Sequence, residues 1–419
     1  MKIIYNSLLY LLLPFVLLRL LWRSLKAPAY RQRWHERFAF FVNPPWQQCI
    51  WVHAVSVGEM IAITPLVKKL KQQYPQIPIL ITTTTPTGSA RVKALFGDEV
   101  GHFYFPYDFA WVIKRFLKKV NPLILIMVET EIWANLLIEC EKQQIPTLLA
   151  NARLSAKSAK GYLRFKNFSQ FIFSKITLVA AQATTDAQRF IKLGVEQQKV
   201  NVTGSIKFDI QLPASLSEQA QVLQYNWGND RPVWTAASTH EGEETVLLEI
   251  QKKLKLECPN VLLVIIPRHP ERFDRVARLI EKKKLKYQRR SKGLPKPEHE
   301  VYLVDSMGEV PLFYSATDIA FVGGSLIQRG GHNILEAAAL GVPVLFGHYM
   351  FNFQSISQMI IEKKAGWQVA DQEELAVMVK RWLSDASERT RIGENARQAV
   401  AENAGALERL LKLINQQLE

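Results

Sequence analysis

Short apolar runs alternate with longer amphipathic segments along most of the chain. Between residues 49 and 182, the runs with the length and composition of buried strands are 49–55, 77–85, 102–108, 123–129, 145–152 and 176–182. The segments between them, of which 60–74 and 109–120 are the clearest, carry apolar residues at helical spacing. Because strands alternate with helices, we expect a parallel sheet covered by helices on both faces.

The alternation pauses at 202–209 and then begins again. The second set of expected strands comprises 232–238, 260–269, 300–305, 318–325 and 342–347. The pattern therefore predicts an α/β protein with two doubly wound halves and a linker around residues 204–230. A chain of 419 residues fits two domains of ~100–200 residues each. Neither half contains a GxGxxG or a GxxxxGK[ST] loop, so we expect neither Rossmann-type dinucleotide binding nor P-loop chemistry.

An apolar stretch near the N-terminus predicts contact with a membrane. Residues 3–22, "IIYNSLLYLLLPFVLLRLLW", are about long enough to span the hydrocarbon core. Asn6, Pro14 and Arg19 weaken that interpretation, so a helix lying in the interface is an open alternative. A signal peptide is disfavoured because the basic cluster follows the apolar stretch. This cluster consists of Arg23, Lys26, Arg31, Arg33 and Arg37.

The basic cluster places the expected anchor helix, residues 1–25, at the cytoplasmic face of a membrane that contains anionic lipids. A formal net charge of +15, from 53 Lys and Arg against 38 Asp and Glu, also indicates an anionic partner. The chain contains no zinc finger, RRM or other reader motif, so we do not expect nucleic acid. Cys49, Cys140 and Cys258 lack metal-ligand spacing, which is typical of reduced structural cysteines in the cytoplasm.

In the second half, the candidate binding residues lie where expected strands end, because open parallel sheets bind ligands at those ends. Glycines precede a helix there, and backbone N–H groups at such a place can approach a phosphate. From one turn into that helix, the Glu336 carboxylate can accept hydrogen bonds from ribose hydroxyls. We therefore predict a nucleotide site; ordinary tight turns and a solvated helix face are the alternatives. The candidates are Arg268, His269, Gly323, Gly324, Ser325, Gly330, Gly331, Asn333 and Glu336.

In the first half, the candidates are carboxylates at strand ends. The stretch "CIWVHAVSVGEM" (49–60) places Glu59 just after a glycine, where a strand passes into a helix. A helix cap explains an acidic residue there, because the helix dipole is positive at its N-terminus. A second pair, Glu129 and Glu131, lies in "ETEIW" (129–133). Such a pair can hold a divalent metal ion, position a sugar or cap a helix.

Segments along almost the whole chain resemble one enzyme family. In order from Ala27 to Ala338 they are "APAYRQRWHERF", "HAVSVGE", "TTTTPTGS", "YFPYD", "ETEIW", "NARLS", "TGSIKFD", "STHEGEE", "PRHPERF", "FVGGSL" and "GGHNILEAA". They resemble the Kdo (3-deoxy-D-manno-octulosonic acid) transferases of lipopolysaccharide synthesis, which are GT-B glycosyltransferases. The resemblance implies two facing Rossmann-like domains, 26–206 for the acceptor and 207–419 for the donor.

The same resemblance implies a reaction and a location. The donor is CMP-Kdo, the acceptor is the lipid A precursor lipid IVA, and transfer inverts the sugar without a metal or any cofactor besides the donor substrate. The enzyme is implied to work at the bacterial inner membrane, on its cytoplasmic face, held by the N-terminal helix as a single-pass or monotopic anchor.

The resemblance also implies roles for individual residues. Inversion requires a general base, which the family places in "SVGE", hence at Glu59, with Gly58 allowing close approach of the sugar. His53 is a rival base, although a packed strand-end histidine is the preferred interpretation. Cations suit the Kdo carboxylate and the phosphates, which adds Lys207 to the donor site and leaves Arg329 as a lesser candidate. The remaining candidates that contact acceptor or sugar are Ser56, Thr85, Thr87, Gly88, Glu129, Glu131 and Arg153.

Two other functions stay open at this point. Another GT-B membrane glycosyltransferase would use a UDP-sugar, and a CMP- or UDP-binding assay distinguishes the two. A non-catalytic membrane adaptor could keep the same fold, although Glu59, Arg268 and Glu336 are all present. The sequence is compatible with the addition of one, two or more Kdo residues.

Overall fold

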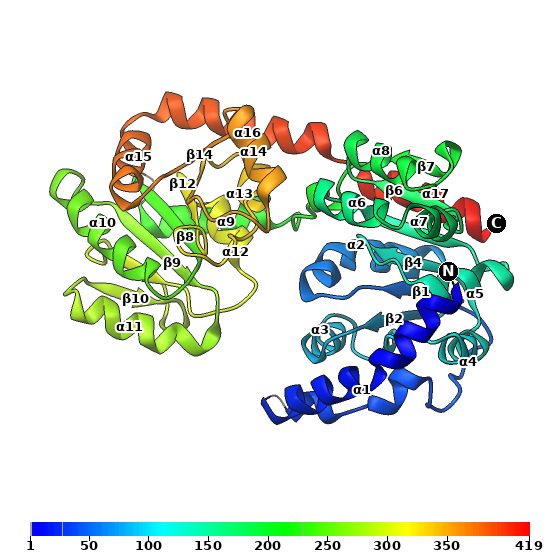
Figure 1. Cartoon of the computed structure of the whole chain (residues 1–419). Helices are drawn as coiled ribbons and strands as arrows, with labels where there is room; N and C mark the ends of the chain where they lie inside the picture. The colour runs from blue at the N-terminus through cyan, green and yellow to red at the C-terminus, as the bar shows by residue number, and fades with distance from the viewer. Residues whose placement is uncertain (1, 27, 229) are drawn as a thin grey trace. The chain divides into compact units, whose positions relative to one another are not determined.

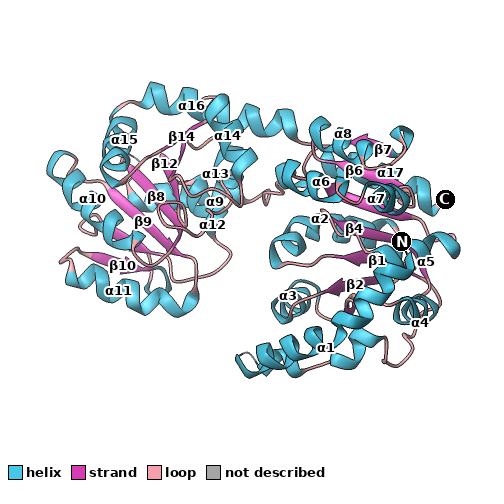
Figure 2. Cartoon of the chain, viewed as in Figure 1, coloured by secondary structure: helices cyan, strands magenta, loops and turns pink. Residues whose placement is uncertain are grey.

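The chain divides into two compact units (Figure 1). The computed structural model describes residues 2–26, 28–228 and 230–419. The first unit consists of Met1–Asp209 together with Ala404–Glu419, and the second unit is Ile210–Asn403. Each unit contains one seven-stranded parallel sheet with helices packed against it (Figure 2). This confirms the predicted α/β class with two doubly wound halves.

The first unit is built on a sheet in which all neighbouring strands pair in parallel. The order across this sheet is β3 (Gly101–Tyr104), β2 (Ile79–Thr83), β1 (Cys49–His53), β4 (Pro122–Val128), β5 (Thr147–Ala152), β6 (Leu178–Ala181) and β7 (Val200–Val202). Its helical segments are α1 (Lys2–Lys26), η1 (Pro28–Arg31), η2 (Trp34–Phe38), α2 (Val57–Gln73), α3 (Pro86–Phe96), α4 (Ala110–Val120), α5 (Ala134–Lys142), α6 (Ala156–Leu163), α7 (Lys166–Phe173), α8 (Thr184–Lys192), η3 (Gln197–Lys199), η4 (Ile206–Phe208) and α17 (Ala406–Leu418).

The second unit repeats the arrangement. The order across its parallel sheet is β10 (Tyr287–Arg289), β11 (Val301–Leu303), β9 (Leu262–Pro267), β8 (Val233–Thr239), β12 (Ile319–Val322), β13 (Val344–Phe346) and β14 (Gly366–Gln368). Its helical segments are α9 (Leu216–Trp227), α10 (Glu243–Glu257), η5 (Pro270–Arg272), α11 (Phe273–Lys282), η6 (Arg290–Lys292), α12 (Val310–Ser315), α13 (Leu335–Ala339), α14 (Gln354–Glu362), α15 (Gln372–Ser384) and α16 (Ala386–Asn403).

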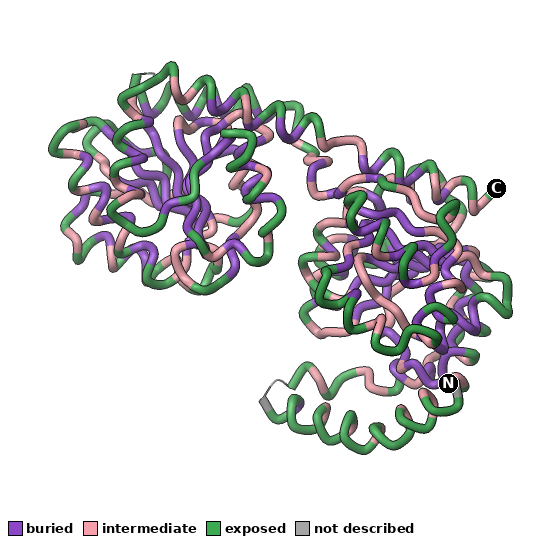
Figure 3. The backbone as a smooth tube through the Cα atoms, turned by 45° about the horizontal axis from the view of Figure 1, so that its top comes forward, coloured by how far each residue is buried: buried purple, intermediate pink, exposed green. Residues whose placement is uncertain are grey.

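Successive strand residues feed two separate cores. In β1, Cys49 and Trp51 belong to one core cluster, whereas Ile50 and Val52 belong to another. The alternation arises because neighbouring side chains of a strand point to opposite faces of the sheet. All five residues of β1 are buried, as expected for a central parallel strand covered on both faces. Figure 3 shows the buried strands inside each unit and the more exposed helices around them.

Both sheets reverse their strand order near the middle. The reversal lies between β1 and β4 in the first unit and between β8 and β12 in the second. At such a switch point the loops after the two central strands diverge and leave room for a ligand. The segments that follow these four strands contain Glu59, Glu129, His240 and Gly323. The fold therefore supplies a candidate site in each unit.

The structure contains three strands that the sequence pattern did not indicate. These strands, β7, β10 and β14, lie at sheet edges and are three residues long. Too few residues of each are apolar for a strand pattern to stand out from the surrounding loops.

The observed second unit also differs from the expected domain, 207–419, at both ends. Its first residues, through Asp209, group with the first unit, and so does α17. Leu407 and Leu411 of α17 join a core cluster of the first sheet. The Asp209 carboxylate accepts the backbone N–H groups of Gly405 and Leu407, which caps the start of α17. An amphipathic helix at the chain end does not reveal by its pattern which sheet it covers.

Candidate functional site

Glu59 lies in the first turn of α2, at the switch point of the first sheet. Ser56 is the N-cap residue, and its Oγ accepts the N–H of Glu59 at 3.2 Å. In return the Glu59 carboxylate accepts the Ser56 hydroxyl and the Val55 backbone N–H, each at 2.8 Å. This reciprocal cap confirms the helix-cap interpretation. The half-buried carboxylate can still accept further hydrogen bonds, because each of its oxygens has two lone pairs.

Two further carboxylates lie close to Glu59 and form an acidic cluster with it, consisting of Glu59, Glu129 and Glu131. Burial raises the pKa of Glu59, and the charge of Glu129 adds to the rise. Burial also raises the pKa of Glu131 to about 7, with smaller contributions from the other two charges. Among the residues that the structure describes, no group of three His, Cys, Asp or Glu side chains could hold a metal ion. Glu59 and Glu131 therefore bind protons more tightly than isolated glutamates do.

His53 is enclosed behind this cluster. Its side chain has no exposed surface, its ring stacks on Phe105, and its Nδ1 lies 3.1 Å from the carbonyl oxygen of Thr82. Burial lowers the pKa of His53 to about 3. Its Nε2 lies 3.9 Å from the Glu131 carboxylate. A fully enclosed neutral ring presents no atom to an acceptor hydroxyl, which supports the interpretation of His53 as a packed residue.

One cationic candidate lies beside the acidic cluster, and a second is joined through its backbone to the loop that contains Glu129 and Glu131. Lys207, in η4, belongs to the first unit, with its Nζ 3.7 Å from Glu129 Oε1, whereas the other donor candidates belong to the second unit. Arg153 follows β5, and its carbonyl oxygen accepts the hydroxyl of Thr130. This bond ties the "ETEIW" loop to the end of the next strand. Glu129 has a φ of 60°, a left-handed conformation that is uncommon for residues other than glycine.

The remaining candidates of the first unit divide into structural and accessible residues. Thr85 is the N-cap of α3, and its Oγ1 accepts the N–H of the buried Gly88 at 3.1 Å. Thr87 is exposed, with its hydroxyl 3.2 Å from that of Thr85. A Cβ atom on Gly58 would meet only Ser56 Oγ, at 3.8 Å, so packing within the protein does not require glycine there. Thr87 and Gly58 are therefore the positions most open to a ligand.

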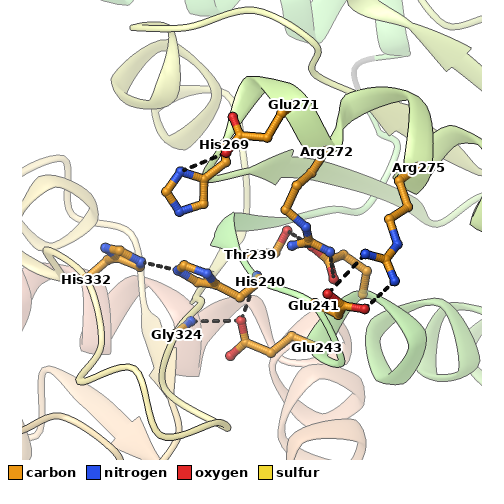
Figure 4. Close-up of polar contacts among 11 residues, drawn as sticks. Thr239, His240, Glu241, Glu243, His269, Glu271, Arg272, Arg275, Gly324 and His332 are labelled. Carbon is orange, nitrogen blue, oxygen red and sulfur yellow. Dashed lines mark hydrogen bonds and ion pairs between the residues drawn. The ribbon is translucent and has the colours of Figure 1, made fainter. Parts of the chain in front are cut away.

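In the second unit, one buried carboxylate organises the loops after β8 and β12 (Figure 4). Glu243 is 1% exposed and accepts the backbone N–H groups of His240, Gly324, Ser325 and Leu326 at 2.8–3.1 Å. Three of these N–H groups lie in the glycine loop that the sequence analysis assigned to a phosphate. The loop does form an anion-binding concavity, but the anion inside it is a side chain of the protein.

Gly323 and Ser325 are likewise used within the unit. A Cβ atom on Gly323 would lie 2.5 Å from the carbonyl oxygen of Ser238. The Ser325 hydroxyl is fully buried, donates to the Val322 carbonyl oxygen at 2.5 Å and accepts the Gly347 N–H at 2.8 Å. Packing within the second unit accounts for both residues.

Two other acidic residues after β8, Glu241 in the loop and Glu244 in the first turn of α10, bind arginines. Glu244, 1% exposed, receives two hydrogen bonds from Arg272, at 2.7 and 3.1 Å. Glu241 pairs with Arg275 at the surface. The two pairs connect this segment to η5 and α11, and Figure 4 shows Arg272 beside the Glu241–Arg275 pair. Arg272 of "PRHPERF" therefore has a structural partner.

Three histidines gather beside these loops (Figure 4). The Nε2 atoms of His240 and His332 are 2.8 Å apart, and the His269 ring lies edge-on to His240 with centroids 5.4 Å apart. Burial lowers the pKa of His240 to about 4 and that of His332 to about 3, and the charge of Arg268 contributes to both. In the described part of the chain, no hydrogen bond or ion pair engages the Arg268 guanidinium. The positive charge of Arg268 therefore lies beside the neutral imidazoles of His240 and His332.

The second glycine pair packs against a neighbouring loop. Gly331 has a φ of +71°, and a Cβ atom there would lie 2.2 Å from the Met350 sulfur, so glycine is required. Asn333 Nδ2 donates to Glu336 Oε1 at 3.1 Å, and burial raises the pKa of Glu336. Helix α13 has five residues, so its dipole favours an anion less than the sequence analysis assumed. Gly330 has a φ of +92°, a conformation that glycine adopts more readily than other residues, so the turn explains this glycine as well.

The sequence analysis did not single out His240, His332 or Glu243, although "STHEGEE" and "GGHN" contain them. A topological signal could have found them. The strands β8 and β12 flank the switch point, so residues in the segments after both strands are expected to contribute to a site there.

Comparison with known proteins decides the family. Residues 32–210 match the family described as 3-deoxy-D-manno-octulosonic-acid transferase (kdotransferase), and residues 239–399 match glycosyl transferases group 1. The chain is 44% identical, over 423 aligned positions, to the 3-deoxy-D-manno-octulosonic acid transferase of Haemophilus influenzae, with 100% of this chain and 99% of that one covered. The chain belongs to the Kdo transferase family.

Other relatives agree with this placement. The Kdo transferase of Bordetella pertussis is 36% identical, with 86% of each chain covered. The crystal structure of a glycosyltransferase from Rickettsia africae ESF-5 superimposes with a TM-score of 0.55 at 17% identity, covering 89% of this chain and 100% of that one. This likeness shows the fold alone, two parallel α/β sheets of GT-B type. As a Kdo transferase, the chain is a glycosyltransferase of lipopolysaccharide synthesis.

This Kdo transferase has one N-terminal apolar helix in the described residues. Its segment Ile3–Leu25 is long and apolar enough to cross a membrane, a property that anchors and signal segments share. Two cations expected to face lipid turn inward instead. Arg37 is 7% exposed and donates to the carbonyl oxygen of Thr84, while Arg33 pairs with Glu36 at 2.6 Å. Ala27 and the side chain of Lys26 lie outside the described residues.

Proposed function

We propose that this enzyme transfers Kdo from CMP-Kdo to lipid IVA, with inversion and without a metal, at the cytoplasmic face of the bacterial inner membrane. Family membership across the full chain supports the two substrates. The first unit takes the acceptor and the second unit takes the donor. The observation that carries the mechanism is the half-buried Glu59 carboxylate at the switch point of the first sheet, oriented by two hydrogen bonds.

Glu59 acts as the general base. The acceptor hydroxyl oxygen forms a bond to the anomeric carbon of Kdo, the bond from that carbon to the phosphate oxygen breaks, and CMP leaves with the electron pair. The hydroxyl proton passes to the Glu59 carboxylate. Burial and the charge of Glu129 raise the pKa of Glu59, which makes it a stronger base than an exposed glutamate. Val55 and Ser56 fix the direction of its carboxylate.

The donor carries a phosphate and a sugar carboxylate, and we assign both to the cluster of histidines and arginine in the second unit. Arg268 supplies a fixed cation without a partner among the described residues, and it can bind either group through two parallel N–H bonds. His240, His269 and His332 supply N–H donors. Glu336 and Asn333, at the start of α13, contact the ribose. Gly324, Gly330 and Gly331 shape the surrounding loops.

The acceptor side uses the accessible residues around the acidic cluster. Thr87 and Ser56 offer hydroxyls, and Gly58 leaves space for the sugar. Lys207 and Arg153 face anionic groups, and Glu129 and Glu131 position sugar hydroxyls. Thr85 and Gly88 support this surface by starting α3.

Replacing Glu129 by Gln should move the acidic limb of the kcat–pH profile to lower pH. The base works only when ionised, so kcat falls as pH falls through the pKa of Glu59. The charge of Glu129 contributes to raising that pKa, so its removal lowers the pKa of Glu59. The profile of Glu141→Gln, at an exposed position of α5, is the matched control. An unmoved limb in Glu129→Gln would contradict the coupling.

Replacing Glu336 by Ala should raise the donor KM about tenfold or more and leave kcat within a few-fold. The contact with the ribose is remote from the reacting carbon, so its loss weakens ground state and transition state alike. Steady-state kinetics with CMP-Kdo as the varied substrate measure the effect, and Glu218→Ala, at an exposed position of α9, is the control. An unchanged donor KM would remove Glu336 from the donor site.

Nucleotide selectivity and turnover test the proposal. Titration of the full chain should detect CMP binding and much weaker UDP binding, and release of CMP from CMP-Kdo should require lipid IVA. Binding of UDP in preference to CMP would favour a UDP-sugar enzyme. Binding of CMP without any turnover would favour a non-catalytic adaptor.

We further propose that α1 holds the enzyme on the inner membrane and that anionic lipids are its partners there. An apolar helix followed by cations supports this assignment. Of those cations, Arg23 and Arg31 are exposed in the structure. The proposal so far allows either a single-pass or a monotopic helix.

A further inference from the structure

We infer that α1 does not cross the bilayer but lies in the plane of one leaflet, with both of its ends on the same side. The inference rests on the proposed membrane association and not on which sugar is transferred. It follows from the way in which both ends of this one helix are attached to the first unit.

The N-terminal end of α1 is hydrogen-bonded into the protein. The Tyr5 hydroxyl donates to Asp108 Oδ2 at 2.7 Å, and Asn135 Nδ2 donates to Asn6 Oδ1 at 2.7 Å. Asp108 and Asn135 are only 4% and 1% exposed, and Asp108 also accepts the backbone N–H groups of Asn135 and Leu136 at the start of α5. This end of α1 is therefore held by buried polar groups of a folded α/β unit.

The C-terminal end of α1 is attached to the same unit. The chain folds back after the helix, so that Arg31 and Trp34 line a cavity together with Leu21, Ser24 and Leu25. The following helical turn, η2, then enters the body of the unit, where Arg37 donates to the carbonyl oxygen at the end of β2. Figure 1 shows α1 and the short turns after it joined to the first unit.

The length of α1 distinguishes a helix that spans the membrane from one that lies in its plane. From Tyr5 to Ser24 the helix rises ~28 Å at ~1.5 Å per residue, close to the ~30 Å thickness of the hydrocarbon core. A spanning helix would place these two residues at opposite membrane surfaces. The unit that holds Tyr5 and Asn6 through buried polar groups is also the unit into which the chain passes at η2, and one folded unit cannot lie on both sides. An orientation in the plane of the membrane satisfies both attachments.

The burial pattern shows that one face of α1 is covered, by the core of the first unit at Tyr5, Leu9 and Leu13 and mainly by η1 further along. The residues that are half-buried or buried recur at helical spacing along its whole length and are Tyr5, Asn6, Leu9, Leu13, Leu17, Leu20 and Ser24. The other faces are exposed and largely apolar, as Figure 3 shows by the exposed colour of this helix. Arg19 is exposed in the second half of the helix. At an interface its guanidinium reaches water, whereas within a span it would be costly.

A second exposed patch continues the same surface and favours a lipid occupant. Tyr10 of α1 contacts the ring of Phe109, the N-cap residue of α4, and Trp111 lies two residues further on, in the first turn of α4. Trp111 and Phe40 are 40% and 51% exposed, and the Arg115 guanidinium lies over both rings, 5.3 and 4.2 Å from their centroids. Aromatic rings with basic groups are typical of membrane interfaces.

We propose that the exposed surface of α1 and α4 contacts an anionic bilayer, because its charges complement those of such a bilayer. The first acidic residue of the chain is Glu36, and α4 contains four basic residues and no acidic one. Exposed apolar side chains between exposed cations match the acyl chains and phosphates of an anionic leaflet. The alternative occupant is a protein with an acidic and apolar surface, and the vesicle experiment described below distinguishes it from a bilayer.

Depth measurements along one face of α1 test the inference. Ile4, Leu11, Leu18 and Leu25 are spaced by seven residues, share one face and are 61–71% exposed. Each is replaced singly by Cys in the full chain with Cys258→Ser, since Cys49 and Cys140 are buried. The variants are spin-labelled and bound to phosphatidylethanolamine vesicles containing phosphatidylglycerol. Contrast between oxygen and a water-soluble nickel relaxation agent reports the depth of each label.

We expect the four labels to report the same shallow depth. A spanning helix would instead place the labels at Leu11 and Leu18 about 10 Å deeper than those at Ile4 and Leu25, because seven residues rise ~10 Å. That profile, or failure of the unlabelled chain to bind these vesicles, would overturn the inference. A label at Val42, which is 89% exposed, gives the depth of the unit itself.

Sidedness provides a second readout that needs no substitution in the helix. A protease-cleavable tag at the N-terminus should be protected in intact spheroplasts and cut in inside-out vesicles, as should a site inserted at Asn43. Cleavage of only the N-terminal tag in spheroplasts would establish a span. Transfer to detergent-dispersed acceptor is measured in parallel, because its loss would count against the proposed reaction and not against the orientation of the helix.

Discussion

Replacing Glu59 by Gln should lower kcat for Kdo transfer about 10²–10⁴-fold and leave CMP binding unchanged. The amide has the size of the carboxylate but cannot take the acceptor proton, and this range is the usual contribution of a general base. Glu59 belongs to the first unit, whereas the proposed nucleotide contacts belong to the second. Single-turnover kinetics with saturating CMP-Kdo, together with CMP titration, measure the two properties separately.

The control for this variant must separate a base from a helix cap, because Glu59 is also part of one. Ser56→Ala removes the other half of the reciprocal cap, at a typical cost of about 1 kcal/mol, while the carboxylate stays. We expect Ser56→Ala to lower kcat much less than Glu59→Gln does, because the carboxylate and its hydrogen bond from the Val55 N–H remain. If Glu59→Gln kept more than about a tenth of the wild-type kcat, its role would reduce to that of a cap.

Replacing Glu243 by Gln should abolish donor binding and destabilise the second unit. The buried carboxylate accepts four backbone N–H groups from two loops, and an amide can accept on one atom only. Its NH₂ group would face two N–H donors, and each buried donor without a partner costs roughly 1–3 kcal/mol, or about 2–6 kcal/mol together. The loop after β12 would then lose its conformation next to the histidines.

Thermal unfolding and CMP titration of this variant check the expectation. Glu241→Gln is the matched control, because Glu241 lies two residues away and pairs with Arg275 at the surface, its side chain 63% exposed. We expect near wild-type stability and CMP affinity for the control. Normal CMP binding by Glu243→Gln would show that the loop after β12 does not shape the donor site.

The alternation of apolar runs was sufficient to predict both sheets, because central parallel strands such as β1 and β4 are buried on both faces and leave uninterrupted apolar sequence. The same pattern could not indicate β14, where only Gly366 of its three residues is buried. It also could not assign α17, because the side of a helix that is apolar does not specify which sheet it covers.

Local pattern placed Glu59 and Glu129 at strand ends but could not pair Glu243 with a glycine loop 81 residues further along the chain. An acidic residue in the first turn of a helix has the same local pattern whether it caps that helix or binds a distant loop. The prediction that Arg33 and Arg37 face lipid was wrong for a related reason. Glu36 and the carbonyl oxygen of Thr84 draw Arg33 and Arg37 inward, and neither contact has a sequence signature.

Mass spectrometry of the acceptor after exhaustive reaction shows directly whether this chain transfers Kdo to lipid IVA. The purified full chain is incubated with lipid IVA and a system that regenerates CMP-Kdo, and the lipid products are analysed together with the CMP released. The account predicts that lipid IVA gains one or more whole Kdo residues, that CMP forms in equal number, and that Glu59→Gln yields neither. Unmodified lipid IVA alongside intact CMP binding, or equal yields from wild type and Glu59→Gln, would contradict it.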